Sequence, residues 1–234
     1  MASTSEFTYG SKLQNAEQVL IHLQSFTNYV APAADQSTGS LQLLITQVKA
    51  RNSDAAGDRE TYSVASDTRQ KIFLKDADSM AKLLSPIGAA VRSVFGKDSK
   101  EAALITALVI KIRGKKISKG AKDPDAVSVS QSERSFGSLT QSFADILATL
   151  DKFGGRYKPA NEKIAMAALS ALLERLTTAN TAVTVAFGAL KQTRDNRFAL
   201  YKTLATLVQR IKDAVKSQYG NSSTEYALIK GLKV

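Results

Sequence analysis

The sequence predicts an all-α protein, an elongated helical bundle made of two tandem three-helix repeats with a pseudo-twofold relation. Two observations lead to this prediction. Apolar residues recur at three- and four-residue spacing along most of the chain, and no segment alternates convincingly between apolar and polar residues, which favours helices over strands. In addition, the second half of the chain repeats the apolar pattern of the first half in the same order, which chance rarely produces.

The repeat consists of matched blocks whose offset drifts slowly, through 127, 128 and 125 to 124 residues. Each block pairs residues of similar size and polarity. The clearest pairs are Leu20 with Leu147, Phe26 with Phe153, Leu41 with Leu169, Asn52 with Asn180, Arg69 with Arg194, Phe73 with Phe198, Ile87 with Ile211, Phe95 with Tyr219, Leu104 with Leu228 and Ile105 with Ile229.

The helices follow from this spacing and from the few residues that interrupt it. The chain has only four prolines, and two of them, Pro32 and Pro159, fall at the same point of each repeat, where each indicates a turn. Glycines are expected to end helices at Gly96, Gly154–Gly155 and Gly220. The predicted helices cover residues 11–30, 36–74 and 76–95 in the first repeat and residues 130–153, 161–200 and 202–219 in the second. A short apolar tail, residues 101–112 and 224–232, closes each repeat.

Two irregularities are expected in the first repeat. The matched blocks leave three extra residues within 53–58, and because an insertion of three disturbs a helical seam, we expect a bulge or short break there. Pro86 lies inside the predicted helix 76–95 and should kink it or shift its start.

The domain organisation follows from the repeat and from charge. Residues 1–112 form the first helical repeat, 113–128 a basic linker rich in turn-forming residues, and 129–234 the second repeat. The repeats are expected to pack as one unit, with two separate bundles on a tether as the alternative. The formal net charge of +11 is uneven, with +1, +3 and +7 in these three segments. A basic excess favours acidic partners, although interspersed charges are also typical of a solvated helical surface.

The ends of the two repeats share a motif: an aromatic residue, a glycine, and then a serine and a glutamate at fixed spacing. The glycine can cap one helix, the serine or its neighbour can cap the next, and the glutamate then lies near the positive end of that short helix. We expect the aromatic residues to occupy equivalent buried corners. The motif residues are Phe95, Gly96, Ser99 and Glu101 in the first repeat and Tyr219, Gly220, Ser223 and Glu225 in the second.

This motif resembles the pattern FG-x-x-S-x-E-Y-x-x-I-x-G-L-K, which closes both halves of a family of uncharacterised bacterial all-helical proteins of similar length. The resemblance covers both repeats and includes a phrase in the long middle helix at residues 178–183. The first repeat departs from it at Ala102, which stands where the family has tyrosine, and at residues 111–114. The resemblance implies a helical fold and no assigned activity.

The sequence offers little catalytic chemistry. It has no cysteine, and its only histidine, His22, is more typical of a surface or packing residue than of a catalyst. No phosphate-binding glycine loop and no Glu-x-x-His pair of a helical metal site is present. Tyr29 and Tyr157 near the proline turns are interpreted as corner-packing residues rather than binding anchors. These observations indicate a protein that is not an enzyme, with no cofactor, metal or small-molecule substrate.

A cluster of basic residues in and beside the linker is the one binding signal. Basic side chains in a glycine-containing segment can contact phosphates without sequence preference, but the cluster lacks interleaved aromatic residues for stacking on single strands. The candidate phosphate contacts are Arg113, Lys115, Lys116, Lys119 and Lys122.

The leading hypothesis is therefore a structural or interaction protein that assembles with itself into a homo-oligomer or filament, because a duplicated unit offers two similar faces. The alternative is non-specific binding of nucleic acid. A minor alternative, a membrane-active helical protein, rests on the apolar run Leu83–Ile112. The N-terminal sequence has no pattern of a secretory signal and no segment is long enough to span a bilayer, so a cytoplasmic location is expected.

Overall fold

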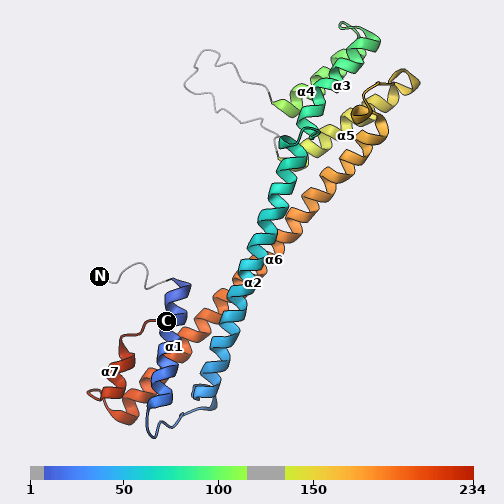
Figure 1. The fold of residues 1–234 in the computed structure, drawn as a ribbon. Helices are drawn as coiled ribbons and strands as arrows, with labels where there is room; N and C mark the ends of the chain where they lie inside the picture. Colours follow the sequence, from blue (N-terminus) through green and yellow to red (C-terminus); the bar gives the residue numbers. More distant parts are fainter. Residues whose placement is uncertain (1–7, 115–134) are drawn as a thin grey trace, which may run out of the picture. The chain divides into compact units, whose positions relative to one another are not determined.

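The computed structural model describes residues 8–114 and 135–234, and within these ranges the chain forms helices and turns with no strand (Figure 1). The predicted all-α class is therefore confirmed. The helices are α1 (Tyr9–Ser25), α2 (Thr38–Gln70), α3 (Met80–Phe95), α4 (Lys100–Arg113), α5 (Phe136–Lys152), α6 (Met166–Tyr219) and α7 (Thr224–Lys230). The short turns are the 3-10 turns η2 (Ala34–Gln36), η4 (Gly154–Arg156) and η5 (Glu162–Ile164) and the π-helical turn η3 (Lys71–Lys75).

Local sequence explains where several helices start. Thr8, Ser99, Ser135 and Ser223 precede α1, α4, α5 and α7, and each side-chain oxygen accepts a hydrogen bond from the backbone N–H three residues later. Such a cap satisfies one of the donors that a helix start leaves without an intrahelical partner.

The chain divides into two compact units, and the division cuts across the two sequence repeats. Unit 1 consists of residues up to Thr61 together with Phe187–Val234, and unit 2 consists of Tyr62–Ala186. Each unit thus combines helices from both halves of the sequence. The predicted repeat boundaries remain a prediction.

The core of unit 1 is formed by α1, the first turns of α2, the last part of α6 and α7. Tyr29 lies after α1 and donates a hydrogen bond from its hydroxyl to the carbonyl of Gln36 at 3.1 Å, which holds the turn into α2. The buried apolar residues of this core are Ala16, Val19, Leu20, Leu23, Leu41, Ile45, Val48, Tyr201, Leu204, Leu207, Val208, Ile211, Val215 and Ile229.

The core of unit 2 is formed by η3, α3, α4, α5 and the first part of α6. Tyr157 is buried, and its hydroxyl donates to the carbonyl of Ile164 at 2.9 Å, so Tyr29 and Tyr157 both act as corner-packing residues. The apolar run Leu83–Ile112 supplies much of this core, including Leu84, Ile87, Val91, Ile105 and Val109.

The break in the first repeat lies elsewhere than the sequence predicts. The bulge expected within residues 53–58 is wrong, because α2 runs without interruption from Thr38 to Gln70. The helix changes instead at η3, where the N–H of Asp76 donates to the carbonyl of Lys71, and α3 starts only at Met80. In the second repeat the two predicted helices 161–200 and 202–219 are one helix, α6, of 54 residues.

The contacts also correct the offset assigned to Arg69 and Phe73. The guanidinium carbon of Arg69 lies 4.0 Å from the centre of the Phe136 ring, and the ring centre of Phe73 lies 4.9 Å from the same point. In unit 1, the guanidinium carbon of Arg197 lies 4.4 Å from the centre of the Tyr9 ring, and the ring centre of Tyr201 lies 4.5 Å from the same point. The counterparts of Arg69 and Phe73 in the second repeat are thus Arg197 and Tyr201, 128 residues later. They are not Arg194 and Phe198, and Phe198 is 64% exposed.

With this offset, α2 matches the first part of α6 without any gap. Two residues separate Tyr201 from Leu204, whereas six separate Phe73 from Met80. The first repeat therefore carries four additional residues at this point, and they coincide with the π-helical turn and the break before α3.

Candidate functional sites: two corners and two clefts

The repeat-end motif forms a corner in each unit, between α3 and α4 in unit 2 and between α6 and α7 in unit 1. Gly96 has φ 90° and ψ 155°, and Gly220 has φ 96°. Positive φ strongly favours glycine at both positions, as predicted, but the ψ of Gly96 is extended rather than that of a left-handed helical cap.

The serines of the motif cap the helices that follow. Ser99 accepts from the N–H of Ala102 and Ser223 from the N–H of Tyr226, both at 3.1 Å. Each hydroxyl also donates to the carbonyl of the preceding motif glycine, at 2.8 Å for Ser99 and 2.9 Å for Ser223. Glu101 and Glu225 lie in the first turns of α4 and α7, where the helix dipole favours a negative charge.

The aromatic residues of the motif are half-buried, so the expectation of buried rings is wrong. Phe95 packs against Phe153 with ring centres 5.0 Å apart, and the guanidinium of Arg156 lies over its ring at 4.2 Å. Tyr219 packs against Phe26 at 5.8 Å, and its hydroxyl donates to the carbonyl of Thr27 at 2.7 Å. Both rings stay partly exposed because the motif lies at a turn on the surface of its unit.

The structure therefore places the eight motif residues in two separate corners, one in each unit, rather than in one site. Their polar groups are used to cap helices, and the contacts explain them as structural features.

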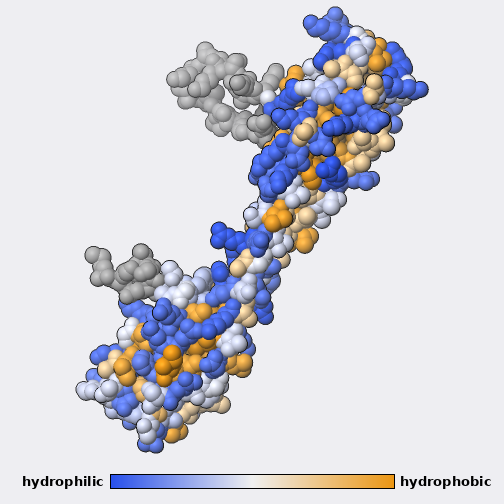
Figure 2. Space-filling view, in the orientation of Figure 1, coloured by the Kyte–Doolittle hydropathy of each residue, from blue (hydrophilic) through white to orange (hydrophobic). Residues whose placement is uncertain are grey.

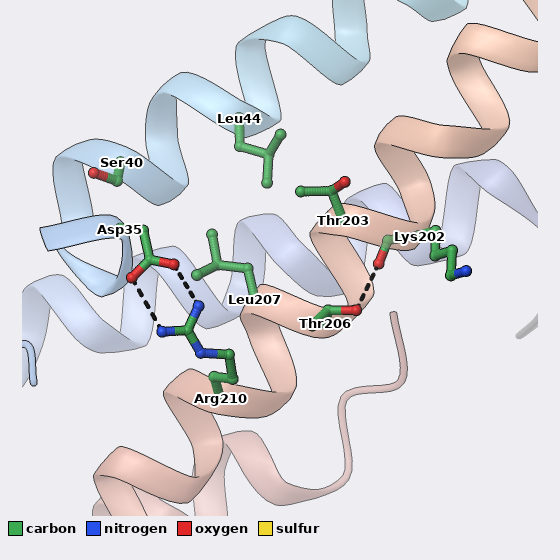
Figure 3. A pocket seen from close by; sticks show the side chains of 8 residues that line it. All are labelled: Asp35, Ser40, Leu44, Lys202, Thr203, Thr206, Leu207 and Arg210. Carbon is green, nitrogen blue, oxygen red and sulfur yellow. Dashed lines mark hydrogen bonds and ion pairs between the residues drawn. The ribbon is translucent and has the colours of Figure 1, made fainter. Parts of the chain in front are cut away.

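Unit 1 contains an open cleft of about 430 Å³ between the start of α2 and the last part of α6 (Figure 3). Leu44 and Leu207 face each other across it, and the carboxylate of Asp35 forms an ion pair with the guanidinium of Arg210 at one end. The threonines and the serine of this cleft already have partners within the unit. Thr203 and Thr206 donate to carbonyls one turn earlier on α6, and Ser40 donates to the carbonyl of Ala34.

Unit 2 contains a second open cleft of about 430 Å³, between α3 and α4. Its lining combines the apolar side chains of Leu84, Val109 and Ile110 with two arginines, Arg92 and Arg113. Arg113 donates a hydrogen bond to the hydroxyl of Ser85 at 2.5 Å. This cleft differs from that of unit 1 in its charge, because no carboxylate is among its lining residues.

Arg113 is the only candidate phosphate contact that the structure describes; Lys115, Lys116, Lys119 and Lys122 lie outside the described residues. Arg92 was not found by sequence reasoning, because it lies within a helix whose pattern is dominated by its apolar face. The signal that would have found it is its place on the same face of α3 as Ser85 and Gly88, at helical spacing.

A buried lysine is a further feature that sequence reasoning missed. Lys212 on α6 is 8% exposed, and its amine donates to the carbonyls of Lys230, the last residue of α7, and of Leu232. Burial lowers the pKa of this amine, and the nearby Asp213 partly offsets the effect. The contact fixes the C-terminal segment, whose Leu232 and Val234 pack against the core of unit 1.

Within residues 8–114 and 135–234, the structure has no group of three or more histidine or acidic side chains arranged to hold a metal ion. None of the helices described there combines the length and apolar character that crossing a bilayer requires.

Comparison of the chain with protein-family models, with curated proteins and with solved structures found no match. The resemblance of the repeat ends to bacterial all-helical proteins thus stays an expectation from the sequence.

Proposed function

We propose that this chain is a non-enzymatic structural or interaction protein that associates with copies of itself. The observation that carries the proposal is an exposed leucine at the same position of both repeat ends. Leu104 on α4 is 57% exposed and Leu228 on α7 is 44% exposed, whereas the neighbouring Ile105 and Ile229 are buried. Single exposed apolar residues are common, but recurrence at a matched position gives one molecule two similar apolar surfaces.

The proposal includes a duplicated architecture of two tandem three-helix repeats with a pseudo-twofold relation. Matched contacts within the two units support the duplication. They are the ring pairs of Phe95 with Phe153 and Tyr219 with Phe26, the serine caps at Ser99 and Ser223, and the tyrosine hydroxyl bonds of Tyr29 and Tyr157.

Two similar surfaces on one molecule allow it to bind two neighbours. If each surface pairs with its own kind or with the other, the product is a chain of molecules that stays open or closes into a ring. Figure 2 fits such contacts, because apolar residues reach the surface of both units among polar ones.

Light scattering across micromolar concentrations, with electron microscopy, tests the proposal. The mass is expected to rise with concentration, and the double variant Leu104→Ser/Leu228→Ser is expected to stay monomeric. Each single variant, Leu104→Ser or Leu228→Ser, separates the two modes of pairing. If each surface pairs with the same surface of a neighbour, the intact surface still pairs and the single variant forms dimers. If each surface pairs with the other surface of a neighbour, the single variant stays monomeric. Leu43→Ser, which removes an exposed leucine on α2, is the control. A wild-type chain that remains monomeric throughout contradicts the proposal.

Non-specific binding of nucleic acid is the second candidate, and the charge of the two units favours it. Residues 8–61 with 187–234 carry 13 Lys/Arg against 8 Asp/Glu, and residues 62–114 with 135–186 carry 14 against 9, which gives each unit a formal charge of +5. A basic excess on both units supports low-affinity contacts with the phosphates of nucleic acid, and the affinity of such contacts falls steeply as the salt concentration rises. A mobility-shift experiment at low salt tests it, and absence of a complex with duplex and single-stranded DNA and RNA removes it.

A further inference from the structure

The cleft between α3 and α4 in unit 2 brings two positive charges to one face of α3. The guanidinium of Arg113 reaches Ser85, and a guanidinium nitrogen of Arg92 lies 3.3 Å from the point where a side chain on Gly88 would begin. Ser85 and Gly88 are three residues apart on the helix, so they occupy the same face on neighbouring turns. The two guanidinium groups therefore lie over adjacent turns of the same surface.

No ion pair joins either arginine to a carboxylate within the described part of the chain. This differs from the cleft of unit 1, where Asp35 neutralises Arg210. Two like charges beside an apolar wall repel each other, and an anion placed between them removes that repulsion. Guanidinium groups also match phosphate oxygens in geometry, because their planar N–H groups donate in pairs. Ser85 and Thr106 add hydroxyl groups to the same lining.

The matched region of unit 1 carries a large side chain at the position that Gly88 occupies beside the cleft of unit 2. Gly88 matches Lys212 at the offset of 124 that relates Ile87 to Ile211. In unit 1 the lysine side chain is buried and bonded to carbonyls at the end of α7 and just after it, and the C-terminal residues pack against the core. In unit 2, Gly88 has no side chain, the guanidinium of Arg92 lies against it, and α4 continues to Arg113. The matched positions of the two repeat ends thus carry different side chains, a glycine beside the cleft in unit 2 and a buried lysine in unit 1.

We infer that this cleft binds a small molecule that carries a phosphate monoester beside an apolar group. The phosphate lies between Arg92 and Arg113, and the apolar group lies against Leu84, Val109 and Ile110. A volume of about 430 Å³ suits a small ligand rather than a polymer. A monoester carries close to two negative charges at neutral pH, which matches two guanidinium groups, whereas each phosphodiester of a nucleic acid carries one. This site goes beyond the proposed self-association and does not depend on it.

Calorimetric titration of the full chain with four probes tests the inference: n-butyl phosphate, inorganic phosphate, di-n-butyl phosphate, and an oligonucleotide without a terminal phosphate. Butyl phosphate is expected to bind most tightly, inorganic phosphate more weakly because it lacks the apolar group, and the diester at least tenfold more weakly. Equal binding of the oligonucleotide through the same arginines would assign the cleft to nucleic acid and overturn the inference. Absence of saturable binding of butyl phosphate at millimolar concentration also overturns it.

Variants locate the site. Arg92→Gln and Arg113→Gln are each expected to weaken binding of butyl phosphate at least tenfold, and Gly88→Leu is expected to abolish binding because an uncharged side chain then occupies the cleft. Lys202→Gln, beside the cleft of unit 1, removes one positive charge elsewhere and should leave binding unchanged. Thermal unfolding of each variant establishes that it folds. Unchanged binding in both folded arginine variants would mean that the probe binds elsewhere, against the inference.

Discussion

At the scale of single residues, the two motif glycines are required by their backbone and not by space. A Cβ at Gly96 or Gly220 would meet no atom within 4 Å, yet both residues have positive φ. Gly96→Ala and Gly220→Ala should therefore each lower the free energy of unfolding by about 1–3 kcal/mol through backbone strain alone.

Gly188 is the matched control, because a Cβ there also meets nothing within 4 Å but the residue lies inside α6 without positive φ. Gly188→Ala should stabilise the protein by roughly 0.5–1 kcal/mol, since alanine is the better helix former. Urea unfolding followed by circular dichroism measures all three variants. Equal effects of the three substitutions would show that the turn geometry described for the corners is incorrect.

Tyr157 makes the stability of the fold sensitive to alkali. Burial raises the pKa of its phenol from 10.0 to about 12. Between these values the unfolded chain has lost the proton that the folded chain keeps, so the contribution of Tyr157 is complete below pH 10 and is lost as pH rises toward 12. The loss amounts to about 2–3 kcal/mol at 1.36 kcal/mol per pKa unit.

Tyr157→Phe should remove this part of the pH dependence. At neutral pH it should cost about 1 kcal/mol, because the hydrogen bond to the Ile164 carbonyl is lost. Tyr29→Phe, the matched change in unit 1, should flatten the alkaline limb less, since burial raises the pKa of that half-buried phenol without the large shift of Tyr157. Denaturant midpoints between pH 7 and 11 test both. An alkaline limb that is identical in Tyr157→Phe and wild type contradicts the assignment.

At the scale of elements, four additional residues interrupt the helix of the first repeat at the point where the second repeat has the continuous helix α6. Deleting Asp76–Ser79 would place Met80 three positions after Phe73, the same spacing as Leu204 after Tyr201. The deletion is therefore expected to join α2 and α3 into one helix and to keep the core of unit 2. Deleting only residues 76–78 leaves one additional residue between the helices. That residue turns α3 by about 100° relative to α2 and should rotate the apolar face of α3 out of the core.

Circular dichroism and thermal unfolding compare the two deletions. The four-residue deletion should retain helix content and a cooperative transition, and the three-residue deletion should lose the transition. The opposite order would mean that the break between η3 and α3 is itself needed for the fold.

The error in placing this insertion has a simple physical origin. Arg194 and Arg197 are one helical turn apart, and so are Phe198 and Tyr201, so residue type alone matches either pair to Arg69 and Phe73. Three residues rotate a helix by about 300°, and the apolar pattern tolerates that difference over short stretches. Only the contacts with Phe136 and Tyr9 distinguish the two registers. The helix types and most ends were predictable because glycines, prolines and capping serines determine them locally.

At the scale of the whole molecule, the sequence could predict which faces are apolar but not which helices they meet. Phe95 packs against Phe153, and Tyr219 packs against Phe26, although each pair joins different repeats. Hydrophobic periodicity carries no information about partners far apart in sequence. The cleft with Arg92 and Arg113 was hidden for the same reason, since it depends on how α3 meets α4 and on the small size of Gly88.

Because each unit draws helices from both halves of the chain, neither half should fold alone. Residues 1–114 contain α1–α4 but lack the parts of α5 and α6 that cover α3 and α4, and residues 135–234 lack α1 and the start of α2. Expressed separately, each fragment should have low helix content or aggregate, since its apolar faces stay exposed. Mixed at equal concentration, the two should form a 1:1 complex with the circular dichroism spectrum of the intact chain. Size-exclusion chromatography with light scattering measures the complex. If either fragment alone shows native helix content and a cooperative transition, its half is a self-sufficient domain, and the exchange of helices between repeats is not what stabilises the two units.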